Sequence, residues 1–187
     1  SLDKAMQEYR QALMANAERA ESQTSLGDLL AQSGDPAEAT KAYLKAVELD
    51  PTFMPAYANH ADFLRQQGRD DVAEERLRAA LEVDPQSGAI NHALGLTLVR
   101  RNSLDAALDH LRLAAEVSPE DARYAYVYAV ALESSGKLRE AIDILATAHA
   151  RHAGNPDIIT ALASYHMKQG DQEKAREYLG KLKALDQ

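Results

Sequence analysis

The six-residue stretch AVELDP, at residues 46–51, decides the fold because the chain repeats it at a fixed interval. ALEVDP occupies residues 80–85 and AAEVSP occupies residues 114–119. Pro51, Pro85 and Pro119 are therefore 34 residues apart, since 85 − 51 and 119 − 85 both equal 34. A fixed period of this length predicts a stack of similar structural units, each packed against its neighbours.

The same period extends over the whole chain without insertions. One column of the aligned rows contains only alanine, a second contains only glycine or alanine, and a third contains large apolar side chains. We expect the small residues to permit close approach of helices, and the large ones to fill the space toward the next unit. The alanine column is Ala39, Ala73, Ala107, Ala141 and Ala175, the small column is Gly27, Ala61, Gly95, Ala129 and Ala163, and the large column is Tyr43, Leu77, Leu111, Leu145 and Leu179.

Each row has the pattern of two helices. Apolar residues follow steps of three and four, as at Ala39, Ala42, Tyr43 and Ala46, and no stretch alternates long enough to indicate a strand. The three prolines lie just past the second helix of a row. A residue suited to a left-handed helix end divides each row, namely Gly34, Gly68, Asn102, Gly136 and Gly170. The sequence therefore predicts an all-α fold of antiparallel helix hairpins.

This pattern resembles the tetratricopeptide repeat (TPR) family, whose units are 34-residue helix–turn–helix hairpins. The signature columns are filled by Leu26, Gly27, Leu30, Gly34, Ala39, Tyr43, Ala46 and Pro51 in the first row, by Tyr57, Ala61, Leu64, Gly68, Ala73, Leu77, Ala80 and Pro85 in the second, and by Leu94, Gly95, Leu98, Ala107, Leu111, Ala114 and Pro119 in the third. The resemblance covers essentially the whole chain. It implies a right-handed superhelical α-solenoid.

The register predicts a single TPR solenoid domain over residues 1–187, with about eleven helices. Residues 1–19 contain the second helix of a truncated repeat, since Ala5 and Tyr9 fall in the columns of Ala39 and Tyr43. Five repeats follow, at 20–53, 54–87, 88–121, 122–155 and 156–187. We expect a C-terminal-type repeat array of a larger bacterial protein, whose N-terminal half-repeat leaves an apolar face open to self-association.

Composition argues against several classes of function. The net charge is −8 and both signs of charge are interspersed, which argues against nucleic-acid binding. Cysteine is absent, so disulfides, thiolate nucleophiles and cysteine-based zinc sites are excluded. No apolar run approaches the ~18 residues of a membrane span. The compartment is left open between the bacterial cytoplasm and the periplasm.

In the TPR family, four columns of each first helix line a concave groove. The resemblance therefore implies a groove for a protein or peptide partner. Its middle is apolar at Leu96, Val99, Tyr126 and Val130, which suits hydrophobic anchors of a peptide or helix. The alternative is that tight curvature buries these four residues against neighbouring repeats. The predicted groove residues are Asn59, Asp62, Arg65, His92, Leu96, Val99, Arg123, Tyr126, Val130 and Glu133.

Asn59 occupies a column that chaperone-binding TPR proteins use to hold a C-terminal carboxylate. Those proteins add lysines and an arginine from the flanking repeats. Here the flanking positions hold Thr24 and Asp28 on one side and Ala89 and Ala93 on the other. The required cations are missing, so the sequence argues against binding of chaperone tails.

The histidines provide the only candidates for metal or acid–base chemistry. His149 and His152 are one turn apart and could form half of a metal site, but the sequence places no third ligand beside them. Solvated histidines at a helix end are the alternative. No Gly-rich phosphate loop, nucleophile elbow, HExxH motif or pair of catalytic carboxylates is present. We therefore expect no metal, no cofactor and no enzymatic activity.

The sequence thus predicts a non-enzymatic scaffold that binds a peptide or helix of a partner in its concave groove. An alternative from another class is an accessory repeat arm of a larger exported enzyme or multihaem electron-transfer protein. The runs LDPTFMPAYANHADFLRQQGR (49–69) and RYAYVYAVALESSGK (123–137) resemble arms that follow such modules in bacterial exported proteins. This alternative favours the periplasm, although without cysteine nothing in the chain attaches haem.

Overall fold

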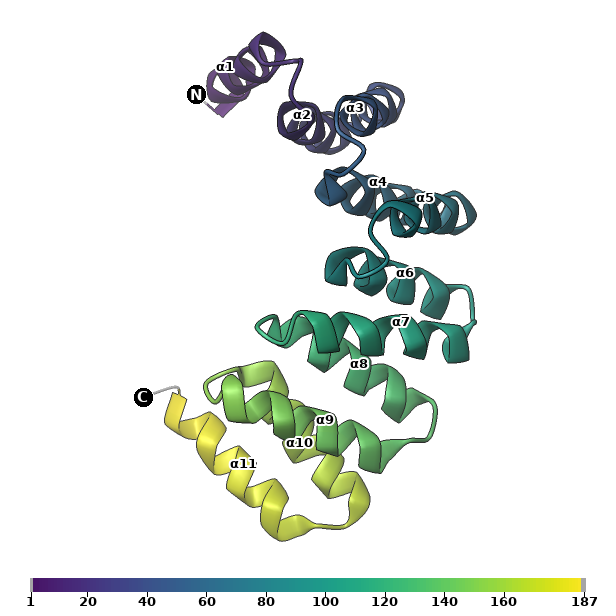
Figure 1. The fold of residues 1–187 in the computed structure, drawn as a ribbon. Coiled ribbons are helices and arrows are strands. Elements are labelled where there is room, and N and C mark those ends of the chain that lie inside the picture. Colours follow the sequence, from purple (N-terminus) through teal and green to yellow (C-terminus); the bar gives the residue numbers. More distant parts are fainter. Residues whose placement is uncertain (1, 186–187) are drawn as a thin grey trace. The chain divides into compact units, whose positions relative to one another are not determined.

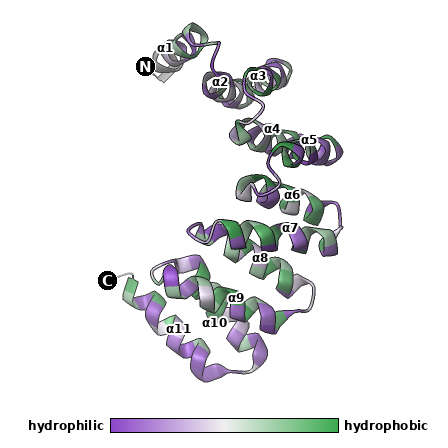
Figure 2. Ribbon diagram, in the orientation of Figure 1, coloured by the Kyte–Doolittle hydropathy of each residue, from purple (hydrophilic) through white to green (hydrophobic). Residues whose placement is uncertain are grey.

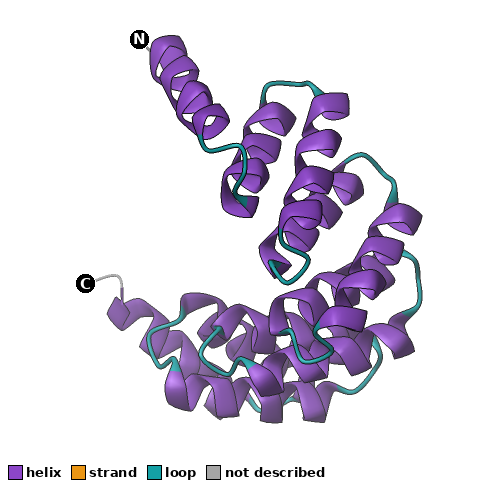
Figure 3. Ribbon diagram, turned by 45° about the horizontal axis from the view of Figure 1, so that its top comes forward, coloured by secondary structure: helices purple, strands orange, loops and turns teal. Residues whose placement is uncertain are grey.

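The computed structural model describes the backbone of residues 2–185, and the side chains of Gln7 and of residues 9–185. Within residues 2–185 the chain consists of helices joined by short turns, without a strand (Figures 1 and 3). The helices are α1 (Leu2–Ala15), α2 (Ala20–Gln32), α3 (Pro36–Leu49), α4 (Met54–Gln66), α5 (Asp70–Val83), α6 (Gly88–Arg100), α7 (Leu104–Val117), α8 (Ala122–Ser134), α9 (Leu138–Arg151), α10 (Pro156–Gln169) and α11 (Gln172–Leu185). The all-α fold predicted from the sequence is confirmed.

The helices divide into two compact units, residues 1–101 and residues 102–187. The single domain over residues 1–187 and the right-handed superhelix stay predictions. Helices α2, α4, α6, α8 and α10 begin at residues 20, 54, 88, 122 and 156. We call these the first helices and the helices that follow them, α3, α5, α7, α9 and α11, the second helices.

The turns after the first helices require a left-handed backbone. Gly34 has a φ of 81°, which costs a residue without a side chain little. The N–H of Asp35 donates to the carbonyl of Leu30, and the N–H of Gly34 donates to the carbonyl of Ala31. These two bonds satisfy carbonyls that the end of α2 leaves free. Asn102 has a φ of 58° at the equivalent position, because asparagine tolerates this conformation better than most other residues.

Within each unit the small columns lie where neighbouring helices meet. Ala39 and Ala73 are fully buried in the first unit, and Ala107 and Ala141 in the second. The large column fills the adjoining space, since Tyr43, Leu77, Leu111 and Leu145 are buried as well. Leu179 of the same column is exposed on α11, the last helix, whose mainly hydrophilic character Figure 2 shows.

The first helices pack directly against one another in addition to their hairpin partners. In the unit of residues 1–101, α4 contacts α2 and α6 as well as α3 and α5. In the unit of residues 102–187, α8 contacts α10 as well as α7 and α9. Each unit therefore has a continuous face of first helices, on which the predicted groove residues lie.

Helix α1 packs against α2 and carries exposed apolar side chains. Tyr9 and Met14 are both at least half exposed. Self-association through this helix stays a prediction.

His60 and His166 occupy columns that hold leucine elsewhere, and both are buried. His60 stacks on the ring of Tyr43 with the centroids 5.2 Å apart, and its Nε2 has no hydrogen-bond partner within residues 2–185. Burial, followed by the charges of Arg76 and Arg69, lowers the pKa of His60 to about 4. This histidine is therefore neutral in the folded protein at pH 7.

The alanine column gives a test of the packing. Ala141→Leu inserts three carbon atoms into a fully buried position of α9, so it should lower the free energy of unfolding by about 1–3 kcal/mol. The matched control is Ala146→Leu, on an exposed position of the same helix. Urea unfolding followed by circular dichroism measures both; equal stabilities for the two variants would contradict the helix packing described above.

His60 gives a test of pH dependence. An unfolded histidine has a pKa near 6.5, so between about pH 6.5 and pH 4 the unfolded state binds a proton that the folded state does not. The free energy of unfolding should therefore fall as the pH is lowered through this range. His60→Leu removes this group and places there the residue found at Leu26 and Leu94 in the same column. We expect the difference in stability between pH 7 and pH 5 to be smaller in the variant; an unchanged difference contradicts the prediction.

Candidate functional site

A polar cavity of about 300 Å³ lies on the first-helix face of residues 1–101. We call it the α2–α4 cavity, because α2 and α4 contribute most of its lining and α3 contributes one tyrosine. The lining residues are Asp28, Ala31, Gln32, Tyr43, Asn59, Asp62, Phe63 and Gln66. Two predicted groove residues, Asn59 and Asp62, are among them.

Asp28 holds this cavity together. Its carboxylate accepts a hydrogen bond of 2.7 Å from the hydroxyl of Tyr43 and a second, of 3.0 Å, from Nδ2 of Asn59. Burial and the neighbouring carboxylate both raise the pKa of Tyr43, which keeps its hydroxyl protonated as a donor. The three side chains thereby connect α2, α3 and α4.

Gly27 makes this arrangement possible. A Cβ atom at this position would lie 2.7 Å from Cε1 of Tyr43, closer than such atoms approach in proteins. The tyrosine ring therefore uses the space that a side chain at Gly27 would take. Gly27 belongs to the glycine and alanine column predicted from the sequence, and its lack of a side chain is what lets Tyr43 line the cavity.

Asp62 and Arg65 form an ion pair on α4. The side chain of Asp62 is 56% exposed, whereas that of Arg65 is 14% exposed. Burial, followed by the charge of Arg100, lowers the pKa of Arg65. The cation of Arg65 is therefore compensated within the protein, and Asp62 is the partner that faces solvent.

The predicted groove residues of α6 differ in exposure. Val99 is 39% exposed and Leu96 is half-buried, and the binding role of both stays a prediction. His92 is only 5% exposed. His92 is therefore corrected from a groove residue to a buried one, because the side chains on either side of it, from Asn91 to Ala93, are buried as well.

The other four predicted residues lie on α8, in the unit of residues 102–187. Val130 is 37% exposed and Tyr126 packs at the edge of the core. Glu133 pairs with Lys168 of α10 at 2.5 Å, and Arg123 is exposed. The apolar middle of the predicted groove is thus divided between the two units, and its continuity stays a prediction.

Four lining residues of the α2–α4 cavity were not predicted as site residues: Gln32, Tyr43, Phe63 and Gln66. A signal for two of them is present in the sequence. Gln32 and Gln66 are one period apart, as are Asp28 and Asp62, and the later rows hold other residue types in both columns. Polar residues that only the first two repeats share, at columns where the later repeats differ, indicate a surface specific to these two repeats and not the core that all repeats have in common.

His149 and His152, the candidate half of a metal site, contact different groups. His149 meets the ring of Tyr178 edge-on, and Nε2 of His152 lies 3.0 Å from the carbonyl oxygen of Pro119. Within the described side chains, no three potential metal ligands come together. Nor is any helix of residues 2–185 both long and apolar enough to cross a bilayer.

Three solved structures illustrate the similarity to known folds. PilF of Pseudomonas aeruginosa has a TM-score of 0.74 at 21% identity, over 96% of this chain and 78% of that one. A crystal structure of MamA has a TM-score of 0.73 at 21% identity, over 86% of this chain and 94% of that one. YrrB, described as a TPR protein with an unusual peptide-binding site, has a TM-score of 0.66 at 24% identity, over 95% of this chain and 91% of that one.

Comparison with curated proteins gives no significant match. Family models for the tetratricopeptide repeat match residues 20–53, 59–116, 92–156 and 132–187, which together cover most of the chain. These repeats support a protein-interaction scaffold in general terms. By its repeat length, its helix hairpins and these matches, the chain belongs to the tetratricopeptide repeat family.

Proposed function

We propose that the protein is a scaffold without chemistry of its own, and that the first-helix face of residues 1–101 binds an extended segment of a partner protein. The α2–α4 cavity is the centre of this site. The observation that carries the proposal is that hydrogen bonds from Tyr43 and Asn59 already hold the carboxylate of Asp28 in place. A lining held by internal hydrogen bonds loses little conformational freedom on binding.

The chemistry of the lining suits the main chain of a peptide. Gln32 and Gln66 are exposed carboxamides, and each offers donors and an acceptor. A peptide in extended conformation presents N–H and C=O groups that such carboxamides can bind. Phe63 and Ala31 leave an apolar part of the lining for the aliphatic portion of a side chain.

The charge of the lining favours a basic segment. Asp28 and Asp62 are both carboxylates, and Arg65 compensates only one of them. The remaining negative charge attracts a lysine or arginine of the partner, and opposite charges also increase the rate of encounter. We therefore expect the bound segment to carry at least one basic residue.

The proposal is tested with an array of immobilised twelve-residue peptides of varied composition. The wild-type protein should bind peptides that contain lysine or arginine. Asp28→Asn preserves an oxygen acceptor for Tyr43 but removes the charge, so affinity for these peptides should fall about tenfold. Asp71→Asn, on an exposed position of α5, is the matched control and should bind like the wild type. Equal affinities of the Asp28 variant and the control contradict the proposed site.

A further inference from the structure

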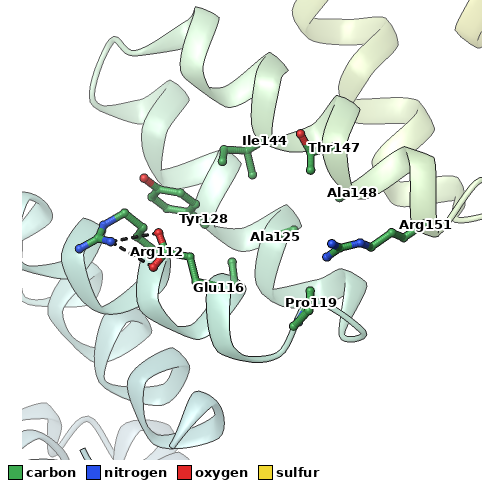
Figure 4. Close-up of a pocket in the computed structure, with 10 residues that line it drawn as sticks. Arg112, Glu116, Pro119, Ala125, Tyr128, Ile144, Thr147, Ala148 and Arg151 are labelled. Atoms are coloured by element: carbon green, nitrogen blue, oxygen red, sulfur yellow. Dashed lines mark hydrogen bonds and ion pairs between the residues drawn. The ribbon is translucent and has the colours of Figure 1, made fainter. Parts of the chain in front are cut away.

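A second cavity, of about 330 Å³, lies in the unit of residues 102–187 (Figure 4). Its floor includes Ala125 and Tyr128 of α8, and its walls are the second helices α7 and α9. With about 100° of rotation per residue, Ala125 and Tyr128 point away from the side of α8 that carries Tyr126 and Val130. This α7–α9 cavity is therefore on the face opposite the predicted groove.

The cavity is hollow because one floor residue is smaller than its equivalents. The column of Ala125 holds Gln23, Tyr57, Asn91 and Ile159 in the other rows, and all four of these side chains are buried. At Ala125 a methyl group takes the place of those larger groups. The space that they fill in their own hairpins is thus open here.

Ala115, in the wall of the cavity, is also smaller than the residues of its column in the other rows. The column of Ala115, on α7, holds Val47, Leu81, His149 and Lys183 in the other rows. Two small-for-large replacements therefore converge at one junction between hairpins. The cavity is a feature of this junction and not a general property of the repeat.

A charged residue also departs from its column at this junction. Arg151, at the end of α9, stands where the other rows have Leu49, Val83, Val117 and Leu185. Figure 4 shows its side chain extending across the cavity toward Ala125 and Pro119. The chain thus places a cation beside this apolar hollow.

The two cations at the cavity differ in their partners. Arg112 is neutralised by Glu116, with Nη1 of the arginine 3.0 and 3.1 Å from the two carboxylate oxygens. Arg151 forms no hydrogen bond or ion pair within the described residues, although it is exposed at the edge of an apolar floor. The lining therefore has one uncompensated positive charge.

We propose that the α7–α9 cavity binds a partner peptide in which a large apolar side chain lies next to a carboxylate. The apolar side chain fills the space above Ala125, and the carboxylate pairs with Arg151. A bidentate arginine–carboxylate pair has the geometry and strength to select for that acid.

The open form of the cavity favours a peptide over a free small molecule. Arg112, Glu116, Thr147 and Arg151 are all exposed around the rim, so a small ligand would leave much of its surface in water. Sites for free small molecules bury most of the ligand. A peptide buries one side chain in the hollow and lays its main chain over the exposed rim.

The residues that other repeats hold in the same columns supply the substitutions for a test. Ala125→Ile places at the floor the residue that Ile159 shows to be accommodated in the same column, and it fills the hollow. Arg151→Val introduces the residue of Val83 and Val117, and it removes the charge. Circular dichroism melting curves first establish that both variants fold; if Ala125→Ile does not, Arg151→Val alone decides, because its position is exposed.

The full chain is used to select from a phage-displayed library of random seven-residue peptides, and the affinities of synthetic versions are measured by calorimetry. We expect selected peptides to pair a large apolar residue with Asp or Glu, and Ala125→Ile to bind them at least about tenfold more weakly. Changing the peptide acid to its amide should cost affinity in the wild type but not in Arg151→Val. Asp28→Asn, at the other cavity, should bind these peptides like the wild type, so the two proposals fail separately.

Three results overturn the proposal. The first is that no peptides are selected, or that those selected lack an acid. The second is that Ala125→Ile, when folded, binds them as tightly as the wild type. The third is that 3-phenylpropionate binds the cavity as tightly as the best peptide, which assigns the cavity to a free carboxylate.

Discussion

The close approach of helices at the glycine and alanine columns is the constraint on which the other features depend. Because Gly27 has no side chain, the ring of Tyr43 fits against α2 and its hydroxyl reaches Asp28. The same ring stacks on His60 of the next hairpin. The absence of a side chain at Gly27 therefore determines both how α2, α3 and α4 pack and how the polar cavity between them is lined.

The helices and their ends follow from the sequence because their causes are local. A left-handed residue such as Gly34 or Asn102 ends a first helix wherever it stands, and a period of 34 residues makes each row support the assignment of the others. Val99 and Val130 are exposed, and their place in a groove stays a prediction. Local conformation and repetition therefore account for the part of the structure that the sequence predicts well.

Side-chain partners do not follow in the same way, because they depend on contacts between rows. Arg65 is a predicted groove residue, yet it is largely buried and paired with Asp62. His92 was assigned to the groove from its column alone, although α6 is buried around much of its circumference. A family column gives the average direction of a side chain. It does not give the burial of a particular helix in its own unit.

Departures from the period are more informative about binding than agreement with it. A column that holds the same residue type in every row, such as the alanine column that begins at Ala39 and ends at Ala175, serves the helix packing that every hairpin requires. Asp28 and Asp62 share a column that holds Leu96, Val130 and Ser164 in the later rows, and Arg151 stands in a column that is apolar in the other repeats. Each of these three charged residues lines a cavity. The buried columns provide most of the stability of a repeat protein, so residues outside them can differ between rows.

The two cavities have opposite charge preferences, and this has a consequence for how partners are distinguished. The carboxylates of the α2–α4 cavity disfavour an acidic segment, whereas Arg151 at the α7–α9 cavity disfavours a basic one. Specificity is a difference of affinities, so a repulsive charge rejects the wrong partner as effectively as an attractive one retains the right partner. Because stability in a repeat protein is a sum over neighbouring interfaces, each bound partner stabilises mainly the helices that line its own cavity. The two proposed sites therefore need no shared conformational change in order to hold two different partners on one chain.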